Sequence, residues 1–182
     1  IVGLEQCPTG YFDAHVRDTL NAGAGLCHPE TVDFVVRHGP TAIRWLIDLG
    51  VPFTQTESGE KAPSYHLMRE GGHSQRRVIH AADATGQAIE NTLEARARAH
   101  PRIQVFEHHI AIDLITRHKL GREGANRCLG AYVLDKVSGR VRVFGARHVA
   151  LATGGASKVY LYTSNPDTST GDGMAMAWRA GC

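Results

Sequence analysis

The chain has 182 residues, of which 42% are hydrophobic and 21% are charged, and its formal net charge is +2. This is the composition of an ordinary globular protein with enough chain to bury a sizeable core. The small charge gives no support to a nucleic-acid or membrane-surface partner, and no apolar run approaches the roughly 20 residues of a membrane span.

The four cysteines are far apart and include no C-x-x-C pair. Their spacing argues against a zinc site or a disulfide scaffold and favours a reduced, cytosolic protein. The sequence starts at Ile1 without a methionine and stops at Cys182 directly after a helical pattern. We interpret both ends as cuts inside a longer protein, which would leave part of any functional site outside the chain.

Residues 1–50 have the pattern of a helical segment. Apolar residues at helical spacing predict a first helix over residues 13–22. Pro29 suits the first turn of a second helix, which Gly39-Pro40 is expected to break. A third helix is then predicted to run as far as Gly50. We interpret these helices as structural.

Residues 51–80 form a polar segment built around a loop. Ser58-Gly59 predicts a turn between two short extended pieces. From Tyr65 to Arg77 the chain gathers ionisable side chains around a pair of glycines. This stretch is either a solvated basic loop or an anion-binding loop, since arginine pairs bidentately with carboxylates and phosphates. Glu70, the only carboxylate in the stretch, is then a salt-bridge partner or a ligand for a substrate cation.

Residues 81–147 combine one helix with several strands. The helix is predicted to be capped near Thr85 and closed by Pro101. Beyond it the hydrophobic period shortens to that of strands, and the Lys136–Gly139 turn joins the last two strands into a hairpin. The last three strands are expected to form an antiparallel meander. The expected strands cover residues 103–107, 110–114, 129–134 and 140–144.

Residues 148–182 begin as an apolar strand over residues 149–152, which stops at Thr153-Gly154-Gly155 and leads through a loop to a helix that contains Met176. A strand that runs into paired glycines lets the backbone pass close to a ligand, because no Cβ intervenes. In a parallel α/β sheet that position is the carboxyl end of a strand, where ligands bind. We interpret the segment as one wall of a nucleotide-cofactor site in a doubly wound α/β fold.

Several common site patterns are missing from the sequence. There is no G-x-S-x-G, no phosphate-binding loop with a lysine after its glycines, and no G-x-G-x-x-G. His108 and His109 lie on or beside a strand, where neighbouring side chains point to opposite faces, so no metal site is predicted.

Two stretches resemble one family. They are ATGGASKVY followed by TSNPDTSTGDGMAMAWRAGC, and the earlier YHLMREGGHSQRRVIHAADATGQAIE. Together they resemble the flavoprotein family of succinate dehydrogenase, fumarate reductase and L-aspartate oxidase. The earlier stretch is similar to the L-aspartate oxidase branch, since the succinate and fumarate branches lack the Arg-Glu-Gly-Gly-His run. The resemblance implies that residues 1–182 are the middle portion of one FAD-binding, Rossmann-like domain. The family's dinucleotide fingerprint would precede Ile1, and its capping domain would follow Cys182.

The resemblance also implies a function. It implies FAD-dependent oxidation of L-aspartate to iminoaspartate in de novo NAD biosynthesis, in the cytoplasm, with quinolinate synthase acting downstream. Hydride would pass from the substrate Cα to flavin N5, and oxygen or fumarate would accept the electrons. The segment alone is expected to be inactive and to retain FAD weakly. Two alternatives stay open: another dicarboxylate or amino-acid oxidoreductase of the same family, and a non-catalytic α/β binding module.

The resemblance assigns roles residue by residue. Glu70 matches the acidic residue that orients aspartate, and a carboxylate is the natural partner for the substrate ammonium. The principal catalytic arginine would lie outside this chain. Arg69, Arg76 and Arg77 are candidates for substrate contact only by their closeness in sequence, with structural salt bridges as the alternative. The FAD contacts carried over from the family are Ile110, Ala111, Asp172, Thr153 and Gly154.

Overall fold

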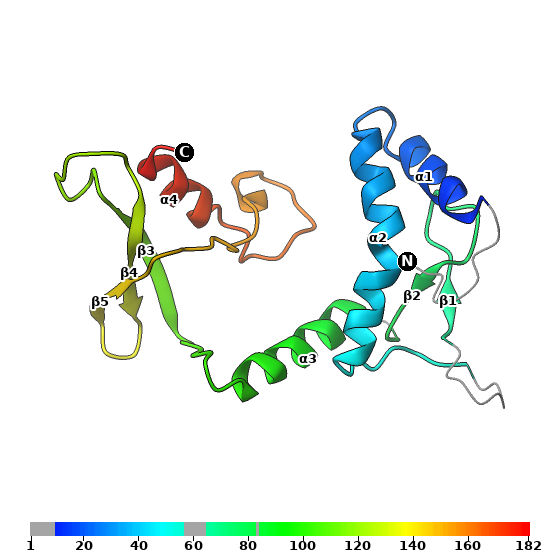
Figure 1. Cartoon of the computed structure of the whole chain (residues 1–182), viewed down its shortest axis with the longest axis horizontal. Coiled ribbons are helices and arrows are strands. Elements are labelled where there is room, and N and C mark those ends of the chain that lie inside the picture. The colour runs from blue at the N-terminus through cyan, green and yellow to red at the C-terminus, as the bar shows by residue number, and fades with distance from the viewer. Residues whose placement is uncertain (1–9, 57–64, 83) are drawn as a thin grey trace. The chain divides into compact units, whose positions relative to one another are not determined.

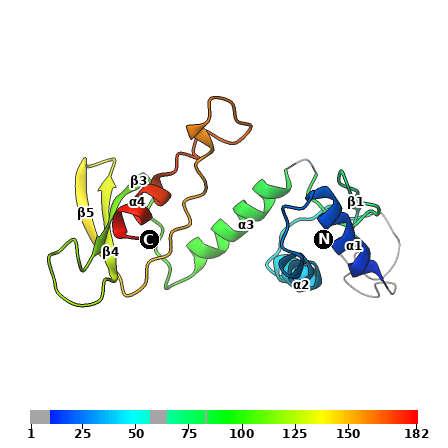
Figure 2. The same ribbon diagram turned by 90° about the horizontal axis from the view of Figure 1, so that it is seen from above.

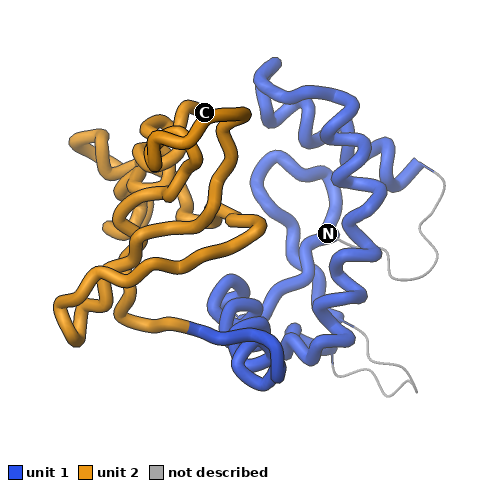
Figure 3. The backbone as a smooth tube through the Cα atoms, turned by 60° about the vertical axis from the view of Figure 1, so that its left-hand side comes forward, with its two compact units in different colours: residues 1–105 blue, residues 106–182 orange. Residues whose placement is uncertain are grey.

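The computed structural model describes residues 10–56, 65–82 and 84–182. The chain divides into two compact units, residues 1–105 and residues 106–182 (Figure 3). Among the helices so described, none combines the length and the apolarity that crossing a membrane requires. The description of residues 1–182 as part of one domain stays a prediction.

The first unit begins with two packed helices, α1 (Tyr11–Ala22) and α2 (Pro29–Asp48) (Figure 1). The predicted first helix is confirmed, with two more residues at its start. An ion pair between Arg37 Nη2 and Asp13 Oδ1, 2.8 Å long, joins the two helices.

The predicted break at Gly39-Pro40 is wrong, because α2 continues through it. A proline inside a helix removes one hydrogen bond and costs about 3 kcal/mol. Here Val36, Pro40 and Ile43 are all buried and recur at helical spacing. Burial of one continuous apolar stripe offsets the cost of the proline, so the predicted third helix is the second half of α2.

The core of the first unit forms between the second half of α2 and the segments that follow it. It consists of Ile43, Val51, Phe53 and Ile79, with Ile89 packed against it. Two short antiparallel strands, β1 (Leu67–Met68) and β2 (Val78–Ile79), pair beside this core. A single bridge between Gln55 and Tyr65 confirms that extended pieces approach each other there. The predicted Ser58-Gly59 turn lies outside the described residues.

Helix α3 (Thr85–Ala99) closes the first unit and confirms the predicted helix. Its cap differs from the prediction, because Ala84 holds the N-cap position without a side-chain hydrogen bond. The Thr85 hydroxyl instead accepts a hydrogen bond of 3.0 Å from the Ala81 N–H. The strand expected over residues 103–107 is wrong: that segment pairs with no strand in the described part of the chain. Alternating side chains do not make a strand without a neighbouring backbone.

The second unit is a three-stranded antiparallel sheet with a helix against it (Figure 2). Its strands β3 (His109–Thr116), β4 (Cys128–Asp135) and β5 (Arg140–Gly145) pair in the order β3-β4-β5, which confirms the predicted meander. A short 3-10 helix, η1 (Ser157–Val159), and helix α4 (Asp172–Ala180) follow. Helix α4 packs on β3, where Met176 is only 2% exposed and Arg179 Nη2 donates to the Ile112 carbonyl.

The strand predicted over residues 149–152 is also wrong. The structure leaves this segment without regular secondary structure, and Leu151 is exposed. Both sheets formed by the described residues are antiparallel, and neither contains a strand that pairs with residues 149–152. An apolar run of this length becomes a strand only where another backbone supplies the hydrogen bonds.

Candidate functional site

The loop that carries Glu70 connects β1 to β2 and is called here the Glu70 loop (residues 69–77). Its ends are held by the pairing of Met68 with Val78 and by a hydrogen bond of 3.0 Å from the Arg77 N–H to the Met68 carbonyl. The tip is a tight turn in which the His73 N–H donates to the Glu70 carbonyl at 3.1 Å. Gly72 has φ +79°, a left-handed conformation that glycine adopts without strain. Glu70 therefore begins a defined turn and is exposed.

The half of the Glu70 loop that leads into β2 is called here its second limb (residues 73–77). A group of side chains called here the Asp18 cluster (Asp18, Ser74 and Arg77) attaches this limb to α1. Asp18 Oδ2 accepts hydrogen bonds from the Ser74 N–H (2.8 Å), the Ser74 hydroxyl (2.7 Å) and Arg77 Nη1 (2.8 Å). These donors, with the Ser74 amide foremost, hold the pKa of Asp18 well below its ordinary range, so the carboxylate stays ionised. Sequence reasoning missed Asp18, because nothing local marks a partner that lies 59 positions away.

The three arginines of the Glu70 loop have different surroundings. Arg77 is 0% exposed, pairs with Asp18 and lies 5.6 Å from the centre of the Tyr11 ring. The Arg77 guanidinium therefore has a structural contact, as in the alternative that assigned these arginines to salt bridges. Arg69 and Arg76 are exposed, and they line a polar cavity of about 670 Å³. The remaining residues of that lining are His66, Leu67, Met68 and Ser74.

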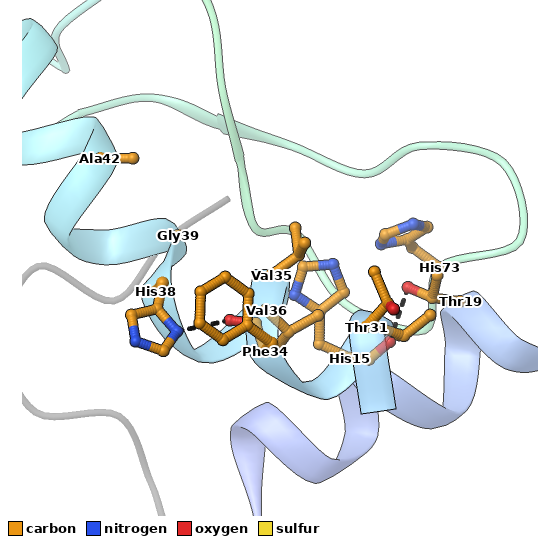
Figure 4. Close-up of a pocket in the computed structure, with 11 residues that line it drawn as sticks. His15, Thr19, Thr31, Phe34, Val35, Val36, His38, Gly39, Ala42 and His73 are labelled. Atoms are coloured by element: carbon orange, nitrogen blue, oxygen red, sulfur yellow. Dashed lines mark hydrogen bonds between the residues drawn. The ribbon is translucent and has the colours of Figure 1, made fainter. Parts of the chain in front are cut away.

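His73 reaches across to α1, where its ring lies 5.2 Å from that of His15 (Figure 4). Burial, and after it the charge of Arg77, lowers the pKa of His15 to about 4, so this imidazole is neutral at neutral pH. The two histidines line one end of a cavity of about 570 Å³ whose other walls are mainly the valines and Phe34 of α2. Such an apolar lining does not suit a doubly charged dicarboxylate.

In the second unit, the predicted glycine-rich segment and the start of α4 lie together. The Gly171 N–H donates to the Gly155 carbonyl at 3.1 Å, directly before α4 begins at Asp172. Gly173 is buried so closely against Thr153 that a Cβ on it would overlap the Thr153 side chain. The structure therefore brings together three of the predicted cofactor residues, namely Thr153, Gly154 and Asp172.

The backbone at this place leaves room for a ligand. Gly154 has φ +74°, and no atom lies within 4 Å of the position that a Cβ would take on either Gly154 or Gly155. Both glycines follow a polar side chain, Thr153, and lie beside the N-terminus of the nine-residue helix α4. Open glycine backbone next to a helix N-terminus favours phosphate groups, so the residues present fit a dinucleotide such as FAD.

Ile110 and Ala111 lie on β3, which is an edge strand of the sheet that the described residues form. The Lys136 N–H donates to the His108 carbonyl, and backbone groups on an antiparallel strand alternate in direction. By that alternation the backbone of Ile110 faces β4, whereas that of Ala111 faces the free edge. A ligand held by backbone contacts at this edge would therefore meet Ala111, while Ile110 offers its side chain, which is 44% exposed.

Comparison with known proteins shows which protein family the chain belongs to. The FAD binding domain family matches residues 3–182, and the chain belongs to that family. This makes the chain part of a flavoprotein whose cofactor is FAD. The mixture of helices and antiparallel sheets and the likeness to solved structures below confirm the predicted fold class.

The most specific likeness is to L-aspartate oxidases. The chain is 59% identical over 177 residues to L-aspartate oxidase of Pseudomonas aeruginosa, covering 96% of this chain and 33% of that protein. It is 46% identical to the chloroplastic L-aspartate oxidase of Arabidopsis thaliana, covering 96% of this chain and 26% of that protein. The chain thus spans about a third or less of the length of these curated relatives.

Solved structures of related enzymes share the fold. E. coli quinol fumarate reductase FrdA superposes with a TM-score of 0.80 at 31% identity, over 96% of this chain and 28% of that chain. The Mycobacterium smegmatis Sdh1 complex gives a TM-score of 0.74 at 28% identity, over 93% of this chain and 29% of that chain.

Proposed function

We propose that the protein containing this chain is an FAD-dependent oxidase of L-aspartate that forms iminoaspartate. Support comes from the names of the relatives that match nearly the whole chain and from the Arg-Glu-Gly-Gly-His run. The single observation that carries the proposal concerns the exposure and the contacts of the Glu70 side chain. It is exposed at the start of a defined turn, and within the described residues its side chain makes no hydrogen bond or ion pair.

A free carboxylate on a fixed loop selects for a cationic ligand. L-aspartate differs from succinate by its ammonium group, which a carboxylate binds through charge-assisted hydrogen bonds. Glu70 would therefore bind the ammonium and orient the Cα–H bond that breaks. Arg69 and Arg76 remain candidates for the substrate carboxylates, because both are exposed and line the polar cavity, although Glu70 is not part of that lining.

The cofactor contacts belong to the second unit. Thr153, Gly154 and Asp172 would hold the dinucleotide at the start of α4, with Ala111 and Ile110 contributing along β3. When bound, FAD supplies the hydride acceptor, flavin N5. The substrate loses a hydride from Cα and a proton from nitrogen, which leaves iminoaspartate.

The cellular setting is proposed with the reaction. Oxygen or fumarate would take the electrons, and fumarate fits the likeness to a fumarate reductase. Iminoaspartate would pass to quinolinate synthase in the cytoplasm, on the de novo route to NAD. These proposals follow from the resemblance of the sequence to the family, and the plant relatives are named as chloroplastic.

The test is the substitution Glu70→Gln in the full-length flavoprotein. Loss of a hydrogen bond to a charged group is worth roughly 1.5–3 kcal/mol, so kcat/KM for L-aspartate should fall about 10- to 150-fold. Reduction of fumarate, which has no ammonium, should stay within about twofold. The measurement is steady-state kinetics of aspartate oxidation and, separately, of fumarate reduction driven by an artificial electron donor other than L-aspartate, on preparations with equal flavin content.

Glu90→Gln is the matched control, because Glu90 is an exposed glutamate on α3 and is expected to have no effect on either reaction. Unchanged aspartate turnover in Glu70→Gln would remove the ammonium-binding role. That result would favour another dicarboxylate oxidoreductase of the same family.

A further inference from the structure

We propose that Asp18, on α1, is a positioning residue that fixes where Glu70 meets the substrate ammonium. The inference rests on the proposed function, since it assigns Asp18 a role in substrate choice through the Glu70 loop. Asp18 does not touch the substrate in this proposal. It acts on the loop that presents Glu70.

The side-chain hydrogen bonds that attach the Glu70 loop to α1 meet at one oxygen atom of Asp18. Asp18 Oδ2 accepts three of the four hydrogen bonds within the Asp18 cluster, two from Ser74 and one from Arg77. In the fourth, Arg77 Nη2 donates to the Ser74 hydroxyl at 3.3 Å. The Asp18 side chain is 13% exposed and the Arg77 side chain is fully buried. The Asp18–Arg77 pair is partly shielded from water, which makes it stronger than an exposed ion pair, whereas both Ser74 hydrogen bonds lie at the surface. The second limb of the loop is therefore held firmly against α1.

Two further contacts hold the turn itself against α1. A Cβ on Gly72 would lie 3.2 Å from the Ala22 Cβ, so the backbone at Gly72 already packs against the end of the helix. His73 contributes its ring to the contact with His15. With the Asp18 cluster, these contacts anchor the loop at Gly72, His73, Ser74 and Arg77.

Glu70 lies across the turn from these contacts. Its carbonyl accepts the hydrogen bond from the His73 N–H, which ties the two limbs together next to the Asp18 cluster. Arg69 and Glu70 themselves are exposed, and their side chains make no hydrogen bond or ion pair within the part of the chain that the structure describes. The position of Glu70 is thus set by the limb that Asp18 holds.

This arrangement predicts a selective defect. If Asp18 acts through Glu70, its loss should weaken only reactions that need the ammonium contact. A dicarboxylate without an amino group should be handled as before. A residue needed merely for folding would affect both substrates alike, and it would lower flavin content as well.

The test compares Asp18→Asn and Ser74→Ala with wild type in the full-length flavoprotein. Asp18→Asn keeps the shape and one oxygen acceptor but removes the charge. Ser74→Ala removes the hydroxyl that donates to Asp18 and accepts from Arg77 Nη2. Asp18→Asn should raise KM for L-aspartate about tenfold, with kcat at saturating aspartate changed less than threefold. Ser74→Ala should give a smaller rise of the same kind. Reduction of fumarate and the FAD content should stay within about twofold of wild type for both variants.

Asp13→Asn is the matched control on the same helix, because Asp13 pairs with Arg37 of α2 and has no contact with the Glu70 loop among the described interactions. It should leave both reactions unchanged. A double mutant completes the test: in a Glu70→Gln background, adding Asp18→Asn should change KM for L-aspartate by less than about twofold.

The outcomes separate this inference from the proposed function. If wild type does not oxidise L-aspartate, the proposed function itself fails. If wild type does so and Glu70→Gln impairs it, two results overturn the role of Asp18 alone. One is an Asp18→Asn variant with wild-type kinetics, and the other is an equal loss of both reactions with effects that add to those of Glu70→Gln.

Discussion

At the scale of single residues, the proposed binding of FAD by the second unit depends most directly on the backbone at Gly154. Gly154 combines φ +74° with open space where a side chain would project. Gly154→Ala should strain the backbone by about 1–2 kcal/mol and place a methyl group where the dinucleotide is proposed to lie. The purified variant should therefore retain less than half of the wild-type FAD, measured as flavin absorbance at ~450 nm per protein.

Gly181→Ala is the control for backbone strain. Gly181, at the end of α4, has φ +94° and equally open surroundings, but it lies outside the proposed cofactor contacts. This variant should keep its FAD. Normal flavin content in Gly154→Ala would show that the cofactor does not approach this glycine.

Residue types in the sequence single out the runs that contain Glu70 and Gly154, because each run has a distinctive pattern of glycines and polar side chains. The roles of these two residues come from the family resemblance and stay predictions. The same runs do not distinguish one arginine from the next. Arg76 is exposed and Arg77 is buried on Asp18, and only a contact 59 positions away separates their roles. In the sequence around it, nothing distinguishes Asp18 from any other polar residue of a surface helix.

At the scale of elements, the sheet of the second unit depends on Gly130 in β4. Gly130 has φ +149°, and a Cβ there would overlap the Phe144 carbonyl of β5. Gly130→Ala should destabilise the β4–β5 pairing by roughly 2 kcal/mol. Hydrogen exchange of the amides in β4 and β5 should accelerate about 30-fold, as that free energy implies.

Gly145 pairs with Gly130 across the ladder and is the matched control. It has no positive φ, and a Cβ on it would meet nothing within 4 Å. Gly145→Ala should leave exchange in both strands within about twofold. Equal protection in the Gly130→Ala and Gly145→Ala variants would contradict the close contact with Phe144.

Elements were predictable where local sequence decides them. Helix α1 and the meander β3-β4-β5 follow from periodicity and from a turn at Gly139, and the structure has them close to the expected bounds. Helix α2 was not predictable through Pro40, because burial of its stripe outweighs the local cost of the proline. The strand predicted over residues 149–152 was wrong for the opposite reason, because a strand needs a pairing partner that local sequence does not specify.

At the scale of the whole molecule, each compact unit is proposed to supply residues to the function. Glu70 and the Asp18 cluster belong to the first unit, and the proposed FAD contacts belong to the second. The chain covers 33% of the Pseudomonas aeruginosa relative. The activity is accordingly a property proposed for the full-length flavoprotein, with this chain supplying the ammonium-binding loop and part of the cofactor wall.

The most direct test of the central claim is anaerobic reduction of the flavin in the full-length protein by L-aspartate. L-aspartate should bleach the flavin band at ~450 nm in wild type, and should do so at least about tenfold more slowly in Glu70→Gln at subsaturating substrate. A flavin that L-aspartate leaves oxidised, or that it reduces equally fast in both proteins, would contradict the claim.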